Sequence, residues 1–275
     1  MSSTSKTPTQ DDDQDYWELL NGIMVHPLAM ENANNNCYFN AVLITLLTLP
    51  HFFSVYNLSD PLNTRKGEVV RHHLCRHLLE YIQILQRNAT QPDMVYSPDL
   101  NWVTPLFGFP QGSQEDAREL LQGLLEHVHQ DDIGFSVKVE EDKNVSYYHD
   151  VIMVDSLSRA VPLLDILSRG YSRFSAYIAI QYERFNAHGH ALVSRIPLSM
   201  SVTPPQSSST YRLQCLLCHQ GPSPTDGHYY CVVRWQERWY MMNDHQVVLI
   251  PHLGQFVDQQ HTHISMLFYS KVTPL

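Results

Sequence analysis

Two residues in the sequence have the chemical type and the local setting of a nucleophile and its general base. Cys37 opens an apolar segment, 37–49, which predicts a buried helix that ends at Pro50. The free N–H groups and the positive dipole end of such a helix favour a thiolate, which is the reactive form of cysteine. His228 follows Gly227 at the start of a predicted strand, where a loop edge is typical of a general base. By position alone, Cys37 is more simply explained as a small buried side chain, so the pair needs further support.

The surrounding residues supply the groups that would complete a cysteine–histidine site. Asn243, with Asp244 beside it, lies fifteen residues after His228 and follows a second predicted strand. If the two strands form a hairpin, Asn243 or Asp244 returns beside His228 and can orient its ring. Four asparagines between positions 32 and 36 precede Cys37 and predict a tight turn, whose amides can donate hydrogen bonds to an oxyanion.

The elements that must position these residues divide the chain into a helical part and a strand-rich part. Besides 37–49, the apolar spacing predicts helices over 69–87 and 114–130, the latter with a capping box formed by Ser113 and Asp116. Loops are expected at 203–210 and 220–227. The predicted strands are 135–140, 147–154, 176–182, 190–194, 211–217, 229–235, 238–242 and 264–269. Helices followed by strands indicate an α+β fold whose halves face each other across a cleft.

Composition excludes several classes of protein. The 275 residues are 43% hydrophobic and 17% charged, which is typical of a globular chain. A net charge of −10 argues against nucleic acid as a partner. Residues 1–16 are polar and acidic, which predicts a disordered tail without a secretory signal. The longest apolar stretch, 39–53, is too short and too often interrupted to span a membrane. Five thinly spread cysteines favour reduced thiols, and we expect a protein of the cytoplasm or nucleus.

Seven ordered segments resemble the motifs of the ubiquitin-specific proteases, a family of papain-like cysteine deubiquitinases. NANNNC at 32–37, followed by Tyr38 and Asn40, resembles the cysteine box N-x-G-N-T-C-Y-x-N-S. GHY at 227–229, with the later Trp239, Asn243, Asp244 and Val247, resembles the histidine box. The other segments are QEDARELL at 114–121, IAIQYERF at 178–185, IPL at 196–198, HQG at 219–221 and LFY at 267–269.

The resemblance implies a single catalytic domain over 17–275, built as a papain-like hand. Its helical thumb would cover about 17–130, its β fingers about 135–195, and a β palm the remainder. Many relatives hold zinc in the fingers through two C-x-x-C pairs, whereas no cysteine occurs here between residues 131 and 200. We therefore expect fingers without zinc, no cofactor, and a monomer that binds ubiquitin or a ubiquitin-like modifier and proteins conjugated to it.

The resemblance also assigns roles to individual residues. Cys37 would attack the carbonyl carbon of the terminal glycine of ubiquitin, and His228 would accept the thiol proton and later donate it to the leaving amine. Asn243 would hold the His228 tautomer, a task that the adjacent Asp244 could share. Asn32 would donate to the oxyanion together with the Cys37 backbone N–H.

Residues of the acidic helix and the histidine box are the expected substrate contacts. In the relatives this helix meets the arginine-bearing tail of ubiquitin, so Gln114, Asp116 and Glu119 are candidates, with Gly227 and Tyr229 beside them. Asp116 and Glu119 are expected on one face, opposite the apolar stripe. Acids that complement the helix dipole are the simpler alternative, which explains Asp116 better than Glu119.

Three features leave the interpretation open. Asn34 replaces the glycine of the cysteine box and is tolerable there if its backbone is left-handed.

CLLCH at 215–219 spells the haem-attachment motif C-x-x-C-H, but within a strand Cys215 and Cys218 would point to opposite faces. The alternatives to a deubiquitinase are a protease for another ubiquitin-like modifier and a catalytically inactive ubiquitin-binding module. In this sequence the complete Cys–His–Asn/Asp set argues against the inactive module.

Overall fold

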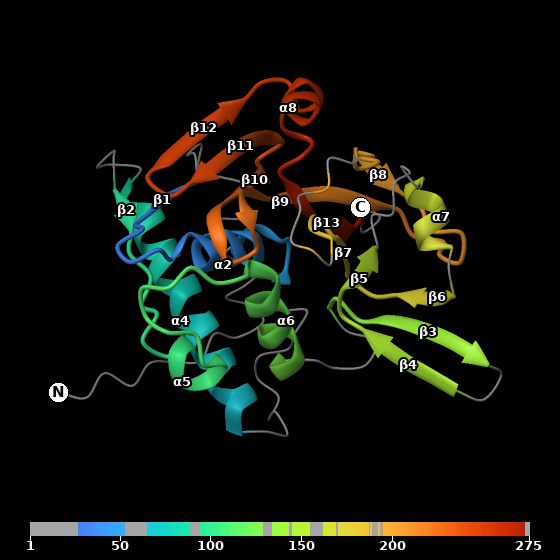
Figure 1. Ribbon diagram of the computed structural model, residues 1–275, viewed down its shortest axis with the longest axis horizontal. Coiled ribbons are helices and arrows are strands. Elements are labelled where there is room, and N and C mark those ends of the chain that lie inside the picture. The colour runs from blue at the N-terminus through green and yellow to red at the C-terminus, as the bar shows by residue number, and fades with distance from the viewer. Residues whose placement is uncertain are drawn as a thin grey trace.

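A computed structural model places a helical region beside a large sheet, with a smaller sheet projecting from the opposite side (Figure 1). It describes residues 27–52, 65–88, 94–128, 134–142, 145–154, 162–168, 170–186, 188, 192 and 195–272. The expected acidic tail at 1–16 lies outside the described residues, as does nearly all of the predicted strand at 190–194. Within the described part, no helix is both long and apolar enough to span a membrane.

Helices and short strands alternate in the first half of the chain, and strands dominate the second half. The helices are α2 (Cys37–Thr48), α4 (Arg65–Asn88), α5 (Val103–Phe107), α6 (Ala117–Val128), α7 (Leu163–Leu167) and α8 (Leu253–Gln260). The first strands are β1 (Ala29–Met30), β2 (Val95–Tyr96), β3 (Val137–Asp142), β4 (Val145–His149), β5 (Ile152–Val154), β6 (Tyr171–Phe174) and β7 (Tyr177–Tyr182). The remaining strands are β8 (Ser201–Val202), β9 (Tyr211–Ser223), β10 (Asp226–Trp235), β11 (Arg238–Asn243), β12 (Gln246–Ile250) and β13 (Ile264–Lys271).

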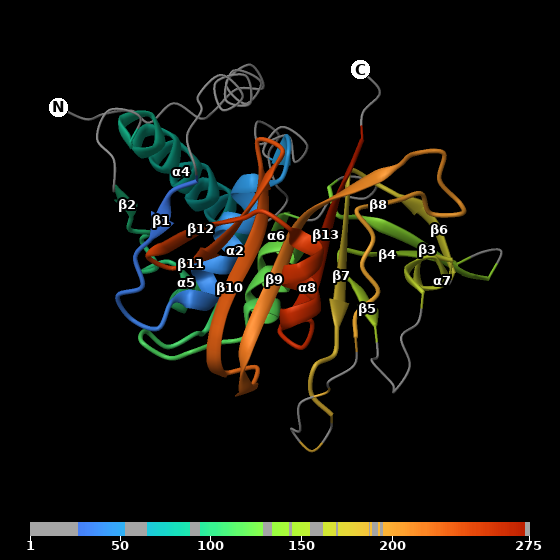
Figure 2. The same ribbon diagram turned by 90° about the horizontal axis from the view of Figure 1, so that it is seen from above.

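Helix α2 is the centre of the helical region. All of its residues are buried, which is typical of a helix that is apolar on every side. It packs against β10 and β9 on one side and against α6 on the other. Figure 2 shows β9 and β10 lying across α2 and α6. The predicted helix is therefore confirmed, and its first residue, Cys37, is held at the junction of helices and sheet.

Helix α6 has the predicted apolar stripe but begins later than expected. The stripe is fully buried and consists of Ala117, Leu120, Leu121, Leu124, Leu125 and Val128. The helix begins at Ala117 and not at 114, because Asp116 is the cap: its Oδ1 accepts the Arg118 N–H at 2.8 Å. The predicted capping box is wrong, since the Ser113 hydroxyl bonds Pro110 O and the Glu115 carboxylate.

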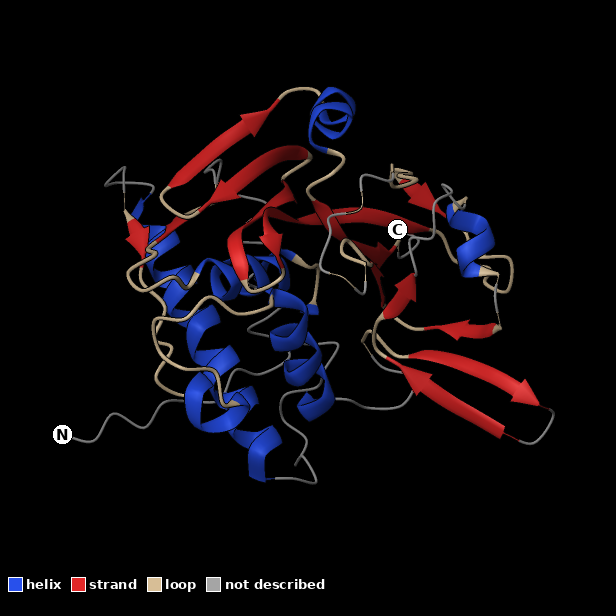
Figure 3. Cartoon of the chain, in the orientation of Figure 1, coloured by secondary structure: helices blue, strands red, loops and turns tan. Residues whose placement is uncertain are grey.

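The large sheet has eight strands in the order β12-β11-β10-β9-β13-β7-β5, with β8 paired to β9. One face packs on the helices around α2, and α8 lies against the other face. Figure 3 shows α2, α4, α5 and α6 gathered at one side, whereas α7 and α8 lie among the strands. Cys215 and Cys218 belong to the cores on the two different faces, as the strand period predicted. The predicted loop at 203–210 is confirmed.

The loop predicted at 220–227 is wrong. Strands β9 and β10 continue through these residues as a hairpin that turns only at Pro224 and Thr225. A bulge between Asp226 and His228 bends the end of the hairpin.

Two glycines allow this bend. Gly227 has φ +142°, and a Cβ added there would lie 2.5 Å from the Cα of Gly221, which faces it across the hairpin. The β9–β10 hairpin therefore places His228 directly after a bulge whose backbone requires glycine at position 227.

A three-stranded sheet with the order β4-β3-β6 forms the projection on the far side of the molecule (Figure 1). Its strands lie within the range 135–195 expected for the fingers, whereas β5 and β7 of the same range belong to the large sheet. Val137 and Phe174 belong to the core beneath it. Within the described residues no group of three or more His, Cys, Asp or Glu could hold a metal ion.

Candidate active site

The thiol of Cys37 sits at the N-terminus of α2, beside the imidazole of His228. Cys37 is buried, and the Asn36 side chain makes no capping hydrogen bond. Asn32 Oδ1 accepts the N–H of Asn36 itself, the residue that precedes the helix, at 2.8 Å. The left-handed residue in this turn is Asn35, with φ +55°, and not Asn34. The turn therefore matches the expected shape, but the positive angle falls one residue later.

Strands β10 and β11 bring His228 and Asn243 together, as the hairpin prediction required. Cys231 pairs with Met242 in this hairpin, so Asn243 returns to the level of the first residues of β10. His228 Nε2 lies 2.5 Å from Asn243 Oδ1. Because the amide oxygen can only accept, Nε2 carries the proton and Nδ1 is the nitrogen left to face Cys37.

The local electrostatics favour a protonated His228. Its hydrogen bond with Cys37 is the largest influence and raises the pKa of His228 from 6.5 to about 9, against the opposing effect of burial. The bond to Asn243 and the charges of Cys37 and Asp244 act in the same direction. At neutral pH the imidazole of His228 is therefore suited to carry both ring protons.

Asp244 joins the residues in front of Cys37 to those that orient His228. Its two carboxylate oxygens accept hydrogen bonds from Asn32 Nδ2 at 2.7 Å and Asn40 Nδ2 at 3.0 Å. The same carboxylate lies 3.7 Å from His228 Nε2. Asn243 is thus the direct partner of the imidazole, and Asp244 adds negative charge and holds the loop. One N–H of the Asn32 amide bonds Asp244, and its second N–H has no partner among the described residues.

Gln114 joins the segment before α6 to the bulge that precedes His228. Its Oε1 accepts the Gly227 N–H at 2.9 Å, and its Nε2 donates to the Gly227 carbonyl. Gln114 and Gly227 were both expected to contact the substrate, and without a ligand they are hydrogen-bonded to each other.

The two acids of α6 differ in their surroundings. The Asp116 side chain is 8% exposed and lies 3.2 Å from the Arg118 guanidinium, whereas the Glu119 side chain is 58% exposed. The expectation that both lie on one face opposite the apolar stripe is wrong for Asp116, because it precedes the helix as its cap and turns back onto it. The Tyr229 hydroxyl lies 2.8 Å from Pro224 O and 3.3 Å from Asp116 Oδ1, so Tyr229 also sits beside this cap.

A cleft of about 290 Å³ lies beside these residues, between the start of α6 and the palm strands. Asp116, Tyr229 and the end of β7 line it, together with His219. Burial lowers the pKa of His219 to about 4, and its Nε2 has no hydrogen-bond partner among the described residues. His219 was not among the predicted site residues, although the HQG motif contained it.

The other cysteines have different surroundings. Cys215 and Cys231 are fully buried within the sheet, and Cys215 Sγ lies 3.2 Å from the Thr45 hydroxyl. Burial raises the pKa of the Cys218 and Cys231 thiols, which makes them poor nucleophiles. Among the described cysteines, Cys37 is the one beside the imidazole of His228.

The helical region, the large sheet and the projecting strands define a papain-like α+β hand. The chain belongs to the ubiquitin carboxyl-terminal hydrolase family, whose model matches residues 29–269. A comparison with curated proteins finds no match.

Solved structures of low sequence identity share the fold. The SAGA DUB module Ubp8/Sgf11/Sus1/Sgf73 bound to monoubiquitin is 16% identical, with a TM-score of 0.67 over 95% of this chain and 74% of that one. Another structure of the Ubp8/Sgf11/Sus1/Sgf73 module is 15% identical, with a TM-score of 0.63 over 95% and 73%.

Proposed function

We propose that this chain is a cysteine-dependent deubiquitinase that hydrolyses the isopeptide or peptide bond after the C-terminal glycine of ubiquitin. The observation that carries the proposal is the contact of Cys37 with His228, whose ring is held by Asn243 at 2.5 Å. The membership of the chain in a family of ubiquitin hydrolases supports the same function.

The reaction follows from the positions of these groups. The Cys37 thiolate attacks the glycine carbonyl, and the oxyanion receives hydrogen bonds from the Cys37 N–H and the Asn32 amide. The His228 imidazolium donates its Nδ1 proton to the departing lysine amine, which leaves an acyl-enzyme thioester. Neutral His228 then takes a proton from water, which attacks the thioester and releases ubiquitin.

The cleft beside α6 is suited to an extended tail that ends in glycine. His219 Nε2 is buried without a hydrogen-bond partner among the described residues. The Glu119 carboxylate, 58% exposed and 3.9 Å from the Arg118 guanidinium, could exchange this weak contact for an arginine of the tail. The Gln114 amide, which holds Gly227, would exchange this contact for the backbone of the tail. These features support ubiquitin over a modifier whose tail lacks arginine.

A covalent probe tests the proposal. Ubiquitin with a thiol-reactive group at its C-terminus should form an adduct with the wild type, detected by mass spectrometry. Cys37→Ala should form none, whereas Cys75→Ala, which removes a buried thiol from α4, should react like the wild type. The proposal fails if the wild type stays unmodified, or if Cys37→Ala still forms the adduct. Probes built on other modifiers, applied in parallel, test the preference for ubiquitin.

A further inference from the structure

A second cleft, of about 330 Å³, borders the residues on either side of Cys37. Asn36 and Tyr38 line it from the cysteine side, and the segment 97–112 forms the opposite wall. It shares no lining residue with the cleft beside α6. Gly112 lines this cleft and Asp116 lines the other, so residues 113–115 connect the two linings along the chain. If the tail of the modifier occupies the α6 cleft, the second cleft is the one left for the leaving group.

The walls of this second cleft are fixed relative to each other. Asn35 Nδ2, from the turn before Cys37, donates to Gly112 O at 2.9 Å on the opposite wall. Within that wall, Gln111 Nε2 donates to Asn101 Oδ1 at 2.9 Å. The cleft is therefore formed before any ligand binds, which lowers the entropic cost of binding.

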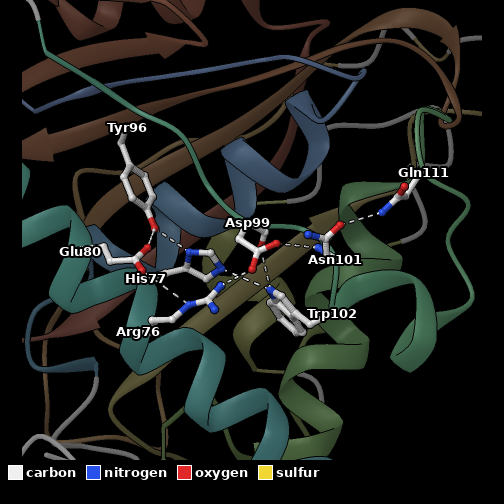
Figure 4. A network of polar contacts seen from close by, with 8 residues as sticks. All are labelled: Arg76, His77, Glu80, Tyr96, Asp99, Asn101, Trp102 and Gln111. Carbon is white, nitrogen blue, oxygen red and sulfur yellow. Dashed lines mark hydrogen bonds and ion pairs between the residues drawn. The ribbon is translucent and has the colours of Figure 1, made fainter. Parts of the chain in front are cut away.

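A polar network behind the wall anchors it to α4 (Figure 4). Arg76 pairs with Asp99 at 2.6 Å, and the Trp102 indole N–H donates to Asp99 O at 2.9 Å. His77, fully buried, lies 2.6 Å from the Tyr96 hydroxyl and accepts the Trp102 N–H at 3.3 Å. The Asp99 carboxylate is thus largely neutralised from behind by Arg76.

The lining of the cleft is suited to a cation with an apolar stem. Glu31 carries a carboxylate that has no partner among the described residues, and Asn36, only 4% exposed, has an Oδ1 that no described donor reaches. No Lys, Arg or His is among the described residues that line the cleft. Tyr38 and Phe109 meet edge to face at 6.1 Å and supply an apolar floor. Burial raises the pKa of Tyr38 to about 12, so its phenol stays neutral.

We propose that this cleft is a leaving-group subsite, in which Glu31 binds a basic residue adjacent to the lysine that carries the modifier. The inference rests on the proposed function, because it takes Cys37 as the nucleophile. An arginine side chain would lay its stem on Tyr38 and Phe109 and its guanidinium against Glu31. The enzyme would thereby read a short sequence in the conjugated protein as well as the modifier.

Three substrates test the inference. Two are ubiquitin conjugates of a short fluorescent peptide through its lysine, with Arg or Glu as the neighbour of that lysine. The third is ubiquitin with C-terminal aminomethylcoumarin, which carries no peptide on the leaving side. The wild type should cleave the Arg conjugate with a kcat/KM about two- to fivefold above that of the Glu conjugate, as expected of one partly exposed ion pair.

Substitutions in the cleft should change this ratio in a defined direction. Glu31→Gln should bring the Arg-to-Glu ratio close to one, and Glu31→Lys should invert it. Ser97→Trp, at an exposed position of the lining, should lower kcat/KM for both conjugates relative to the coumarin substrate. Glu68→Gln, which removes an exposed carboxylate on α4, is the matched control and should keep the wild-type ratio. Because each ratio is taken within one variant, partial unfolding cancels.

The outcomes separate the two proposals. The subsite is refuted, and the proposed function stands, if the wild type cleaves the coumarin substrate but its Arg-to-Glu ratio is one. The same conclusion follows if Glu31→Gln and Glu31→Lys both keep the wild-type ratio. If the wild type cleaves none of the three substrates, the proposed function is refuted and the subsite with it.

Discussion

Replacing Cys37 by alanine should change the titration of His228, a residue on a different strand. The hydrogen bond with Cys37 is the largest of the causes that raise the pKa of His228 to about 9, and the charge of Cys37 is a further one. Without them, burial opposes only the Asn243 bond and the Asp244 charge. We therefore expect the pKa of His228 to fall by about two pH units in Cys37→Ala, toward the ordinary value near 6.5.

Imidazole NMR of ¹⁵N-labelled protein measures this change directly. The chain has 16 histidines, and the His228 signal is assigned by its loss in His228→Gln. The ring should titrate at about 9 in the wild type and in Cys75→Ala, and well below this in Cys37→Ala. An unchanged titration near pH 9 in Cys37→Ala would refute the reasoning that the thiol and the imidazole form one pair.

The same pair predicts how stability depends on pH. The pKa of His228 is higher in the folded state, about 9, than the 6.5 of an unperturbed group, so protonated His228 stabilises the fold. This contribution is complete below pH 6.5 and disappears as the pH rises through about 9. The free energy of unfolding, measured with urea, should therefore fall over this window in the wild type by more than in Cys37→Ala. The alkaline limb of kcat/KM should lie near pH 9.

Three further substitutions test the neighbouring contacts. Asn243→Ala removes the 2.5 Å contact to His228 and should lower kcat for the coumarin substrate by about 10²-fold, the lower end of general-base catalysis; an unchanged kcat would contradict the orienting role. Gly227→Ala, where a Cβ meets backbone, should lower the free energy of unfolding by about 2–4 kcal/mol, against about 1 kcal/mol for Gly112→Ala, whose Cβ meets nothing. Equal losses in urea denaturation would show that crowding is not the cause. Gln114→Glu turns a carboxylate toward the Gly227 carbonyl and should cost about 1–3 kcal/mol, and an unchanged urea midpoint would rule this contact out.

Helices α2, α4 and α6 and the hairpin of β10 with β11 were predicted from the sequence, because burial gives apolar residues a regular spacing. The stripe of α6 and the apolar run of α2 have one dominant explanation each. The α8 helix at Leu253–Gln260 was not predicted, although Leu253, Phe256 and Val257 have helical spacing. It is one of the shorter helices, and only Leu253 and Val257 are buried, so the signal is weak.

The errors occurred where local chemistry resembles a loop but tertiary contacts decide. The segment 220–227 contains Gly, Pro, Ser and Asp, yet it continues a hairpin that has no core on either side and so shows no apolar alternation. The residues that would orient His228 were placed correctly as a pair, but the sequence could not separate them. Their roles differ because Asp244 has φ +48° in the turn after β11, which directs its carboxylate to Asn32 and Asn40.

The shared use of Asp244 limits which residue position 243 can accept. Many hydrolases orient the catalytic histidine with a carboxylate, but here Asn243→Asp would set two acids side by side at one imidazole nitrogen. Two such carboxylates do not ionise independently, and one of them would hold its proton into the working pH range. Activity would then acquire an additional ionisation that the wild type does not have. A neutral amide at 243 avoids this repulsion between carboxylates, while Asp244 holds the loop before the nucleophile. Asn243 can therefore be replaced by Asp only if Asp244 is replaced by a neutral residue at the same time.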